Sequence, residues 1–454
     1  MHRFWQTLKL YRGFILAGIL ALIVIGLFLS DTNSGRSAKS KQDAKSIKFL
    51  SLAWQVEAIT TIRKMVTQWN DEHPEQPVEL IQGTWSSVHD FLITGFETGD
   101  IPDIFHYESA IIVDFALRDY LADLAPYIQD ELKQDVLDVA WSSVTRSDGQ
   151  VIGIPFLAES FIVLYNKKLF AEAGISAPSF EKPWSWSDLQ LAARRLTLDI
   201  NADGVTDRWG VAIGLRSGAN LIMNHSIAFG GSYFYTDENS LIDVQVGEPE
   251  KELLGDILTM LYTDKSMAPA SLGQTSSALI PGFLAGRYAM LVGAGAWARQ
   301  QVIENAEESF EWGVMPPLRA RTQKTGLNTQ TFSISKSSAK LIPAMQFINY
   351  LVEKDNMAQM AASDWLLPTR RSCLEMPRFN TPEDGWDVVS QSAKYLSTGP
   401  WVGMAGYNEW KSRVANPTFQ LLFSDRITLD DAARRIELES NSMLHRYQVR
   451  GDKW

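Results

Sequence analysis

The sequence predicts an α/β fold divided into two lobes, with sheets covered by helices. Two observations support this class. From residue 47 onward, segments with the pattern of strands alternate with segments whose apolar residues recur at helical spacing. The chain of 454 residues is also too long for one hydrophobic core, so two large lobes are expected. Its contents of 45% hydrophobic and 21% charged residues are typical of a globular protein.

The N-terminus predicts a membrane segment. Residues 1–30 carry three basic and no acidic side chains, and the apolar run GFILAGILALIVIGLFL occupies 13–29. Neither a small-x-small cleavage motif nor a cysteine for lipid attachment follows this run. We therefore expect an uncleaved anchor with its basic end in the cytoplasm, and a cleaved signal peptide is the alternative. The Ser- and Lys-rich residues 31–46 are expected to form a flexible tether.

Strands and helices are predicted to alternate at the start of the folded body. The strands are expected at 46–54, 78–83 and 102–108, and the helices at 58–74 and 86–99. Repeats of this kind predict a parallel sheet with right-handed crossovers. The stretch 153–175 begins like a buried strand and finishes like a helix. The C-terminal third is predicted to be mainly helical, with helices at 339–362 and 429–447.

Charge and motifs exclude several classes of function. Without residues 1–30 the chain has 39 basic and 53 acidic side chains, a balance of −14, which argues against nucleic acid as a partner. The single cysteine, Cys373, allows neither an internal disulfide nor a Cys-rich metal site. No P-loop, H-E-x-x-H, C-x-x-C or G-x-S-x-G motif is present. The G-x-G-x-x-A spacing at 293–298 is interpreted as a tight turn with a close backbone approach.

One loop has the ligand spacing of a calcium site. The segment DINADGVTDRWG at 199–210 supplies oxygen ligands at loop positions 1, 3, 5, 7 and 9, which are Asp199, Asn201, Asp203, the Val205 carbonyl and Asp207. Position 12 should be a bidentate Glu but is Gly210. The alternative is an Asx-rich turn whose carboxylates bond to their own backbone. Either way, the loop is expected to be structural, and no cofactor is required.

Several motifs in one order resemble the extracellular solute-binding proteins of ABC importers, in the sugar-binding group of the maltose-binding-protein type. The resemblance covers nearly all of residues 47–420. The motifs are GDIPDIFH (99–106), GIPF…LYNKKLFAEAGI (153–175), PWSWSDLQLAARRL (183–196), FLAGRYAMLVGAGAW (283–297), FSISKSSAK (332–340), AMQFINYLVEK (344–354) and LLPTRRS (366–372).

The resemblance implies a type II periplasmic-binding-protein-like fold, in which two α/β lobes close around a ligand at a hinge. Lobe I is then expected at 47–157, completed by 328–372, and lobe II at 158–327, completed by 373–454. The implied function is capture of a solute outside the cytoplasmic membrane and its delivery to an ABC permease. A sugar-sensing accessory protein without transport is one alternative. A glycan-active enzyme that uses Glu108 and Glu159 as an acid/base pair is a weaker one.

Candidate ligand-binding residues follow from the rule that open α/β sheets bind ligands beyond the carboxyl ends of their strands. Glu159 lies among apolar neighbours with no nearby base, so the resemblance places it at a lobe crossing, facing the cleft. Trp54, Trp85 and Glu108 end or follow predicted strands, and Trp297 ends the GAGAW turn. Loops that could line the cleft add Tyr233, Asn328, Trp365 and Trp401. For each Trp, ordinary packing is the alternative.

The composition of this candidate set favours a carbohydrate. It contains no Arg cluster of the kind that binds phosphate or carboxylate groups. Aromatic rings can stack on the apolar face of a sugar, and acidic or amide groups can bind its hydroxyls. Several Trp suit several subsites, so we expect an oligosaccharide. A sugar-phosphate ester or a polyamine would be equally compatible with the resemblance, and a polyamine would suit the acidic balance.

Overall fold

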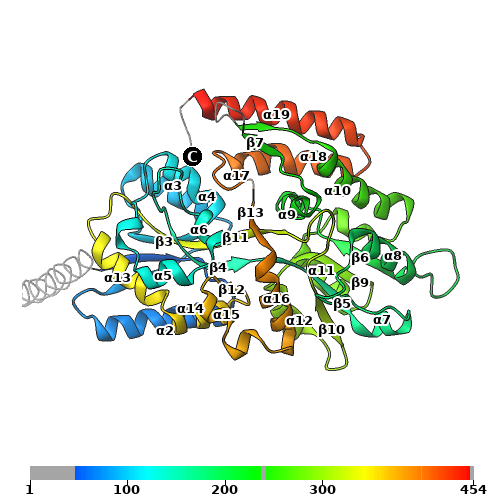
Figure 1. The fold of residues 1–454 in the computed structure, drawn as a ribbon, viewed down its shortest axis with the longest axis horizontal. Coiled ribbons are helices and arrows are strands. Elements are labelled where there is room, and N and C mark those ends of the chain that lie inside the picture. Colours follow the sequence, from blue (N-terminus) through cyan, green and yellow to red (C-terminus); the bar gives the residue numbers. More distant parts are fainter. Residues whose placement is uncertain (1–45, 237–241, 400, 450–454) are drawn as a thin grey trace, which may run out of the picture.

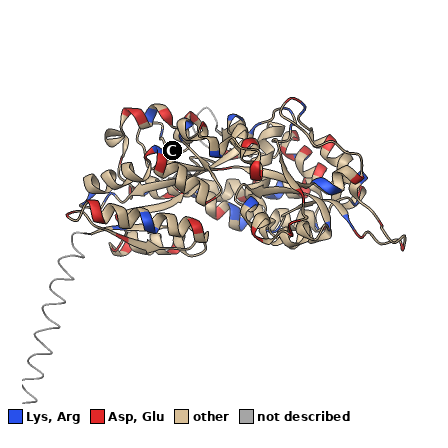
Figure 2. Cartoon of the chain, turned by 90° about the horizontal axis from the view of Figure 1, so that it is seen from below, with Lys and Arg blue, Asp and Glu red and all other residues tan. Residues whose placement is uncertain are grey.

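Two separate β-sheets, each covered by helices, form the two lobes of the predicted α/β fold (Figure 1). The computed structural model describes residues 46–236, 242–399 and 401–449. The predicted membrane segment and nearly all of the predicted tether lie outside these residues. Within them, no helix combines the length and apolar character that crossing a membrane requires. Acidic and basic residues are spread along the helices of both lobes (Figure 2).

The lobe I sheet contains seven strands, in the order β12-β4-β11-β3-β1-β2 with β13 paired to β11. The strands are β1 (Ile47–Ser51), β2 (Val78–Gln82), β3 (Ile104–Glu108), β4 (Ile154–Glu159), β11 (Thr325–Ile334), β12 (Leu367–Pro368) and β13 (Leu396–Thr398). Strands β2, β1 and β3 are parallel, as predicted. The complete sheet is mixed, because β11 runs antiparallel to both β3 and β4. It enters from a distant part of the chain, where no local strand–helix–strand repeat fixes its direction.

The helices of lobe I include the first part of the chain and two distant segments. They are α2 (Val56–Glu72), α3 (Val88–Thr98), α4 (Ser109–Leu117), α5 (Asp130–Asp135), α6 (Asp138–Ser142), α13 (Leu341–Leu351), α14 (Lys354–Ser363) and α15 (Arg371–Leu374). Helix α2 buries residues at helical spacing, including Ala58, Ile62 and Met65. The predicted single helix at 339–362 is two helices. The chain is extended at Glu353, a break that apolar spacing could not reveal.

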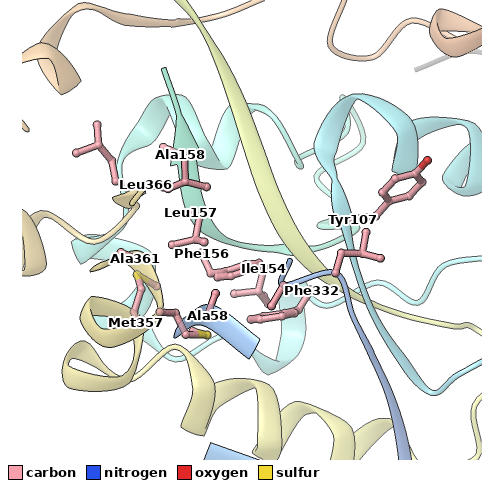
Figure 3. Close-up of a cluster of buried hydrophobic side chains, with 14 of the residues drawn as sticks. Ala58, Tyr107, Ile154, Phe156, Leu157, Ala158, Phe332, Met357, Ala361 and Leu366 are labelled. Carbon is pink, nitrogen blue, oxygen red and sulfur yellow. The ribbon is translucent and has the colours of Figure 1, made fainter. Parts of the chain in front are cut away.

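A cluster of apolar side chains joins the lobe I sheet to helices α2 and α14 (Figure 3). At its centre, the rings of Phe156 on β4 and Phe332 on β11 stack with centroids 3.9 Å apart. Ala58 on α2 and Met357 on α14 pack into the same cluster. The burial of these rings fixes β4 beside β11, and thereby the positions of the residues at the ends of these strands.

Lobe II is built on a four-stranded sheet in the order β10-β5-β9-β6. Its strands are β5 (Phe161–Asn166), β6 (Trp209–Ile213), β9 (Tyr288–Gly295) and β10 (Trp312–Met315), and β7 (Phe234–Thr236) and β8 (Ile242–Val244) form a separate pair. Its helices are α7 (Lys167–Glu172), α8 (Trp186–Leu196), α9 (Ala219–Phe229), α10 (Glu248–Leu258), α11 (Ser276–Leu284) and α12 (Ala298–Asn305). Helix α8 begins with a capping box between Ser185 and Asp188.

The C-terminal segment packs mainly on lobe II. Its helices are α16 (Trp386–Ser392), α17 (Tyr407–Trp410), α18 (Asn416–Phe423) and α19 (Leu429–Val449), and Figure 1 shows α19 crossing one side of the molecule. The predicted helix at 429–447 is therefore present. The segment also reaches lobe I, where the Gly406 N–H donates to Oδ1 of Asp114 on α4 over 2.7 Å.

Candidate functional site

At its first crossing, the chain passes from lobe I to lobe II through a single residue. Strand β4 of lobe I ends at Glu159 and strand β5 of lobe II begins at Phe161, so only Ser160 separates the two sheets. The expectation of one strand at the start of 153–175 is corrected to two strands in different sheets. Both halves are apolar, and the period of a strand does not change at the crossing, so the pattern alone shows no boundary.

Four of the predicted site residues lie along one edge of the lobe I sheet. Asn328 on β11 is paired with Glu159 on β4, and two residues further along β11, Gln330 is paired with Glu108 at the end of β3. Trp54 lies beyond the end of β1 in the same sheet, and 43% of its surface is exposed. The carboxyl ends of β1, β3 and β4 therefore place an indole and two carboxylates at this edge.

Lobe II contributes Trp297, which lies just after β9. Its indole N–H donates to Oε1 of Glu159 over 2.8 Å. Its ring also meets Trp54 edge to face, with centroids 5.5 Å apart and planes at 82°. Gly295 makes this arrangement possible, because a Cβ there would lie 2.1 Å from the Trp297 Nε1 and 2.5 Å from the Glu159 Oε1. The glycines of GAGAW thus serve a close approach, as the sequence indicated, but both belong to strand β9, and the turn is formed by the two residues that follow it.

The environment of Glu159 favours its neutral form. Burial and, to a smaller extent, the charge of Glu108 raise the pKa of its carboxyl group against the opposing hydrogen bond from Trp297, and the net result is a pKa of about 7. The side chain nevertheless keeps some exposed surface. Within 46–236, 242–399 and 401–449, neither Glu159 nor Glu108 forms an ion pair.

A third carboxyl group, that of Asp364, lies close to this cluster, and sequence analysis did not identify it. Asp364 follows α14 in lobe I and is 4% exposed. Burial, then the charge of Glu159, raises its pKa to about 7, and the Gln55 amide opposes the rise. Its Oδ1 has no hydrogen-bond partner within the described part of the chain. It borders a small cavity that Ser51 and His106 also line.

Trp365 belongs to a buried junction around Arg299 of α12. The Arg299 guanidinium is fully buried and donates to three backbone carbonyls, those of Ala296, Trp365 and Asp384, over 2.9, 3.0 and 3.2 Å. Its central carbon lies 4.0 Å from the ring centroid of Trp386 and 5.3 Å from that of Trp365. Burial lowers the pKa of Arg299 to about 9. Arg299, which lies two residues after Trp297, therefore connects lobe II with lobe I and with the C-terminal segment.

The remaining predicted aromatic residues lie at different depths. Trp85 is half-buried after β2, with its ring edge-on to His106 at 5.5 Å. Trp401 is 1% exposed and stacks on Tyr407, whose pKa is raised far above its usual value by burial and by the charge of Glu108. Tyr233 is fully buried in the lobe II core. In this conformation Trp401 and Tyr233 therefore offer a ligand almost no surface.

The predicted calcium loop is present, but its side chains bond to its own backbone. The two carboxylate oxygens of Asp199 accept the N–H groups of Asp203 and Gly204, and Asp207 accepts those of Ile200 and Asn201. Among the residues that the structure describes, no group of three His, Cys, Asp or Glu side chains is placed to hold a metal ion. The geometry is that of the Asx-rich turn, the alternative interpretation of this segment. Asn201, Asp203 and Val205 take part in the same turn.

Two of the residues described above had no signal in the sequence. Asp364 precedes Trp365 and Arg299 follows Trp297 by two positions, but neither belongs to a recognisable motif. Their proximity arises from long-range packing between α12, the end of α14 and the segment before α16. Only their closeness in sequence to predicted site residues could have drawn attention to them.

Comparisons with known proteins support the family resemblance. A family described as "Bacterial extracellular solute-binding protein" matches residues 53–358. An "Uncharacterized lipoprotein in oleD 5'region" of Streptomyces antibioticus is 34% identical over 414 residues, which cover 91% of this chain and 89% of that protein.

Solved structures with similar architecture come from other bacteria. The ABC substrate-binding protein of Listeria monocytogenes in complex with cycloalternan has a TM-score of 0.74 at 24% identity, covering 88% of this chain and 99% of that one. The sugar-binding protein MalE of Xanthomonas citri has a TM-score of 0.77 at 17% identity, covering 90% and 100%. At these identities the two structures establish the fold, which is the predicted two-lobed one.

Proposed function

This chain belongs to the bacterial extracellular solute-binding protein family, and we propose that within it the protein captures an oligosaccharide between its lobes and delivers it to an ABC permease. The family predicted from the sequence is thereby confirmed. The proposal adds the ligand and the delivery. It includes no catalytic step, because the proteins that the chain resembles are described as binding proteins.

One observation carries the proposal: two indoles from opposite lobes, Trp54 and Trp297, meet beside the carboxylate of Glu159. Indole faces can stack on the apolar faces of sugar rings, and carboxylates accept hydrogen bonds from hydroxyls. Glu108 and Asn328 add polar groups at the same sheet edge. The Listeria protein named above was solved with a carbohydrate, cycloalternan, and supports the same ligand class here.

A ligand that contacts both lobes also explains how a partner protein could detect that the ligand is bound. If the ligand contacts Trp54 on lobe I and Trp297 on lobe II, its binding free energy favours the closed arrangement of the lobes. A permease that recognises this arrangement would then distinguish loaded from empty protein. We place the protein on the outer face of the cytoplasmic membrane, held by residues 1–30. Membrane fractionation tests this placement, since a soluble mature protein that starts after residue 30 would remove the anchor.

Calorimetry on the full chain in detergent, with a panel of oligosaccharides, tests the ligand class. A ligand at about 100 times its Kd should stabilise the protein by roughly 2.7 kcal/mol, which also appears as a rise in Tm. Trp54→Ala should weaken binding about tenfold, or roughly 1.4 kcal/mol. Phe91→Ala is the matched control, because Phe91 is 44% exposed on lobe I but belongs to α3 rather than to the site. Equal affinities of the two variants would contradict the proposed site.

A further inference from the structure

The carboxyl groups at the site point to a more specific ligand, and this inference rests on the proposed function. Glu108, Glu159 and Asp364 act on one another electrostatically: the charge of Glu108 affects Glu159, and that of Glu159 affects Asp364. The other polar groups that act on these two carboxyls are the Trp297 indole and the Gln55 amide, and neither carries a charge. Glu159 and Glu108 also pair with residues only two positions apart on β11, Asn328 and Gln330, and Asp364 follows α14 within the same lobe, so the three acids lie near the crossing between the lobes.

Within the described residues, no basic side chain pairs with Glu108, Glu159 or Asp364. None of the three acids belongs to an ion pair within residues 46–236, 242–399 and 401–449. Arg299 is near Trp365, but its three hydrogen bonds go to backbone carbonyls. A carboxyl group that is desolvated without a basic partner is costly to ionise, which is why the pKa values of Glu159 and Asp364 are raised, and a bound cation would lower that cost.

A second observation indicates that the partner comes from outside the protein. Oδ1 of Asp364 is buried and has no hydrogen-bond partner in the described chain, an arrangement that native structures rarely leave without a reason. Asp364 borders a small cavity that Ser51 at the end of β1 and His106 in the middle of β3 line as well. An N–H donor with a positive charge would satisfy the acceptor and the excess negative charge together.

We propose that the ligand is an amino-bearing oligosaccharide, and that its protonated amine binds among Glu108, Glu159 and Asp364. The sugar rings then stack on Trp54 and Trp297, and the indole faces also attract the positive charge. A neutral oligosaccharide would supply no positive charge to stabilise the ionised forms of these acids. A linear polyamine would supply the charge but would make no use of the stacking surface.

The test uses matched probes on the full chain in detergent at pH 7. The probes are trisaccharides of glucosamine and of galactosamine, each with free amines and in its N-acetylated form, together with maltotriose and spermidine. Calorimetry in two buffers of different ionisation enthalpy measures the Kd and the number of protons exchanged. At least one free-amine trisaccharide should bind ten times more tightly than its N-acetylated form. Its binding should also release protons, because a cation favours the ionised carboxylates.

Asp364→Asn identifies the residue responsible. The variant removes one charge and retains the size of the side chain, so the preference for the free amine should fall below about threefold. If maltotriose or an N-acetylated form binds as tightly as the free amines, the amine inference is overturned while the proposed function stands. If spermidine binds and none of the trisaccharides does, both the amine inference and the proposed oligosaccharide function are overturned. Absence of binding by every free-amine probe would also overturn the amine inference.

Discussion

Trp297 of lobe II donates its indole N–H to Oε1 of Glu159 of lobe I over 2.8 Å, one residue from the point where the chain crosses between the sheets. This hydrogen bond links the two lobes through their side chains, next to the place where the backbone itself connects them. Because contacts close to a crossing change little when lobes rotate, the pair can keep its geometry while more distant surfaces separate.

Trp297→Phe should raise the pKa of Glu159. The indole N–H stabilises the carboxylate, whereas a phenyl ring of similar shape cannot donate to it, so a rise on the order of one pKa unit is expected. The measurement is an NMR titration of the Glu159 carboxyl carbon. Trp141→Phe is the matched control, because the Trp141 indole donates to a backbone carbonyl, that of Lys133, on lobe I. A Glu159 pKa that is the same in both variants would show that the Trp297 bond is not formed in solution.

Asp364→Asn should stabilise the unliganded protein at alkaline pH. Burial and Glu159 raise the Asp364 pKa from 3.8 to about 7, so between these pH values the native state holds a proton that the unfolded chain releases. The free energy of unfolding of the natural protein therefore falls as the pH rises from about 4 to 7. Asparagine cannot ionise and avoids this loss, so the variant should be more stable by about 2 kcal/mol at pH 8 and little changed at pH 4.

Urea unfolding between pH 4 and pH 8 measures this effect. Glu79→Gln on the exposed face of β2 is the control, and it should change the free energy of unfolding by less than about 0.5 kcal/mol throughout. A variant at Asp364 that is destabilised equally at all pH values would mean that the carboxyl group has a partner in solution.

Arg299→Met should destabilise the protein strongly. The substitution leaves the buried carbonyls of Trp365 and Asp384 without the donors that Arg299 supplies, and it removes one of the two N–H groups that bond to the Ala296 carbonyl, at a cost of about 3 kcal/mol or more. Arg434→Met, in an exposed pair on α19, should cost less than about 0.5 kcal/mol. Denaturant unfolding compares the two. If the two losses were similar, the Arg299 junction would contribute little to holding the lobes and the C-terminal segment together.

Much of the fold could be predicted, because the residue patterns that specify these elements lie within short stretches of the sequence. Apolar spacing located β1, α2 and β2 to within a few residues, and a series of short motifs indicated the family. The direction of β11 could not be predicted in this way, because its neighbours β3 and β4 are more than 150 residues away in sequence. The break between α13 and α14 was also missed, since apolar residues continue across it at helical spacing.

The candidate site was predictable in part for the same reason. The rule about strand ends selected Trp54, Glu108 and Glu159, and the structure brings these residues to one edge of the lobe I sheet. The choice of Tyr233 and Trp401 rested only on their positions in loops, and both are buried in the lobe II core. Loop membership says little about the depth of a side chain, because a large ring can fold back into the core beneath its loop.

The loop at 199–210 should keep its stability when divalent metals are removed. Asp199 already accepts two backbone N–H groups, so its carboxylate oxygens are occupied without an ion. A chelator should therefore leave the Tm unchanged, as measured by calorimetry with and without added calcium. Asp199→Ala should lower the free energy of unfolding by about 1 kcal/mol, since it leaves the two N–H groups to water in an exposed loop. A fall in Tm with the chelator, absent from Asp199→Ala, would establish a calcium site and contradict this account of the loop.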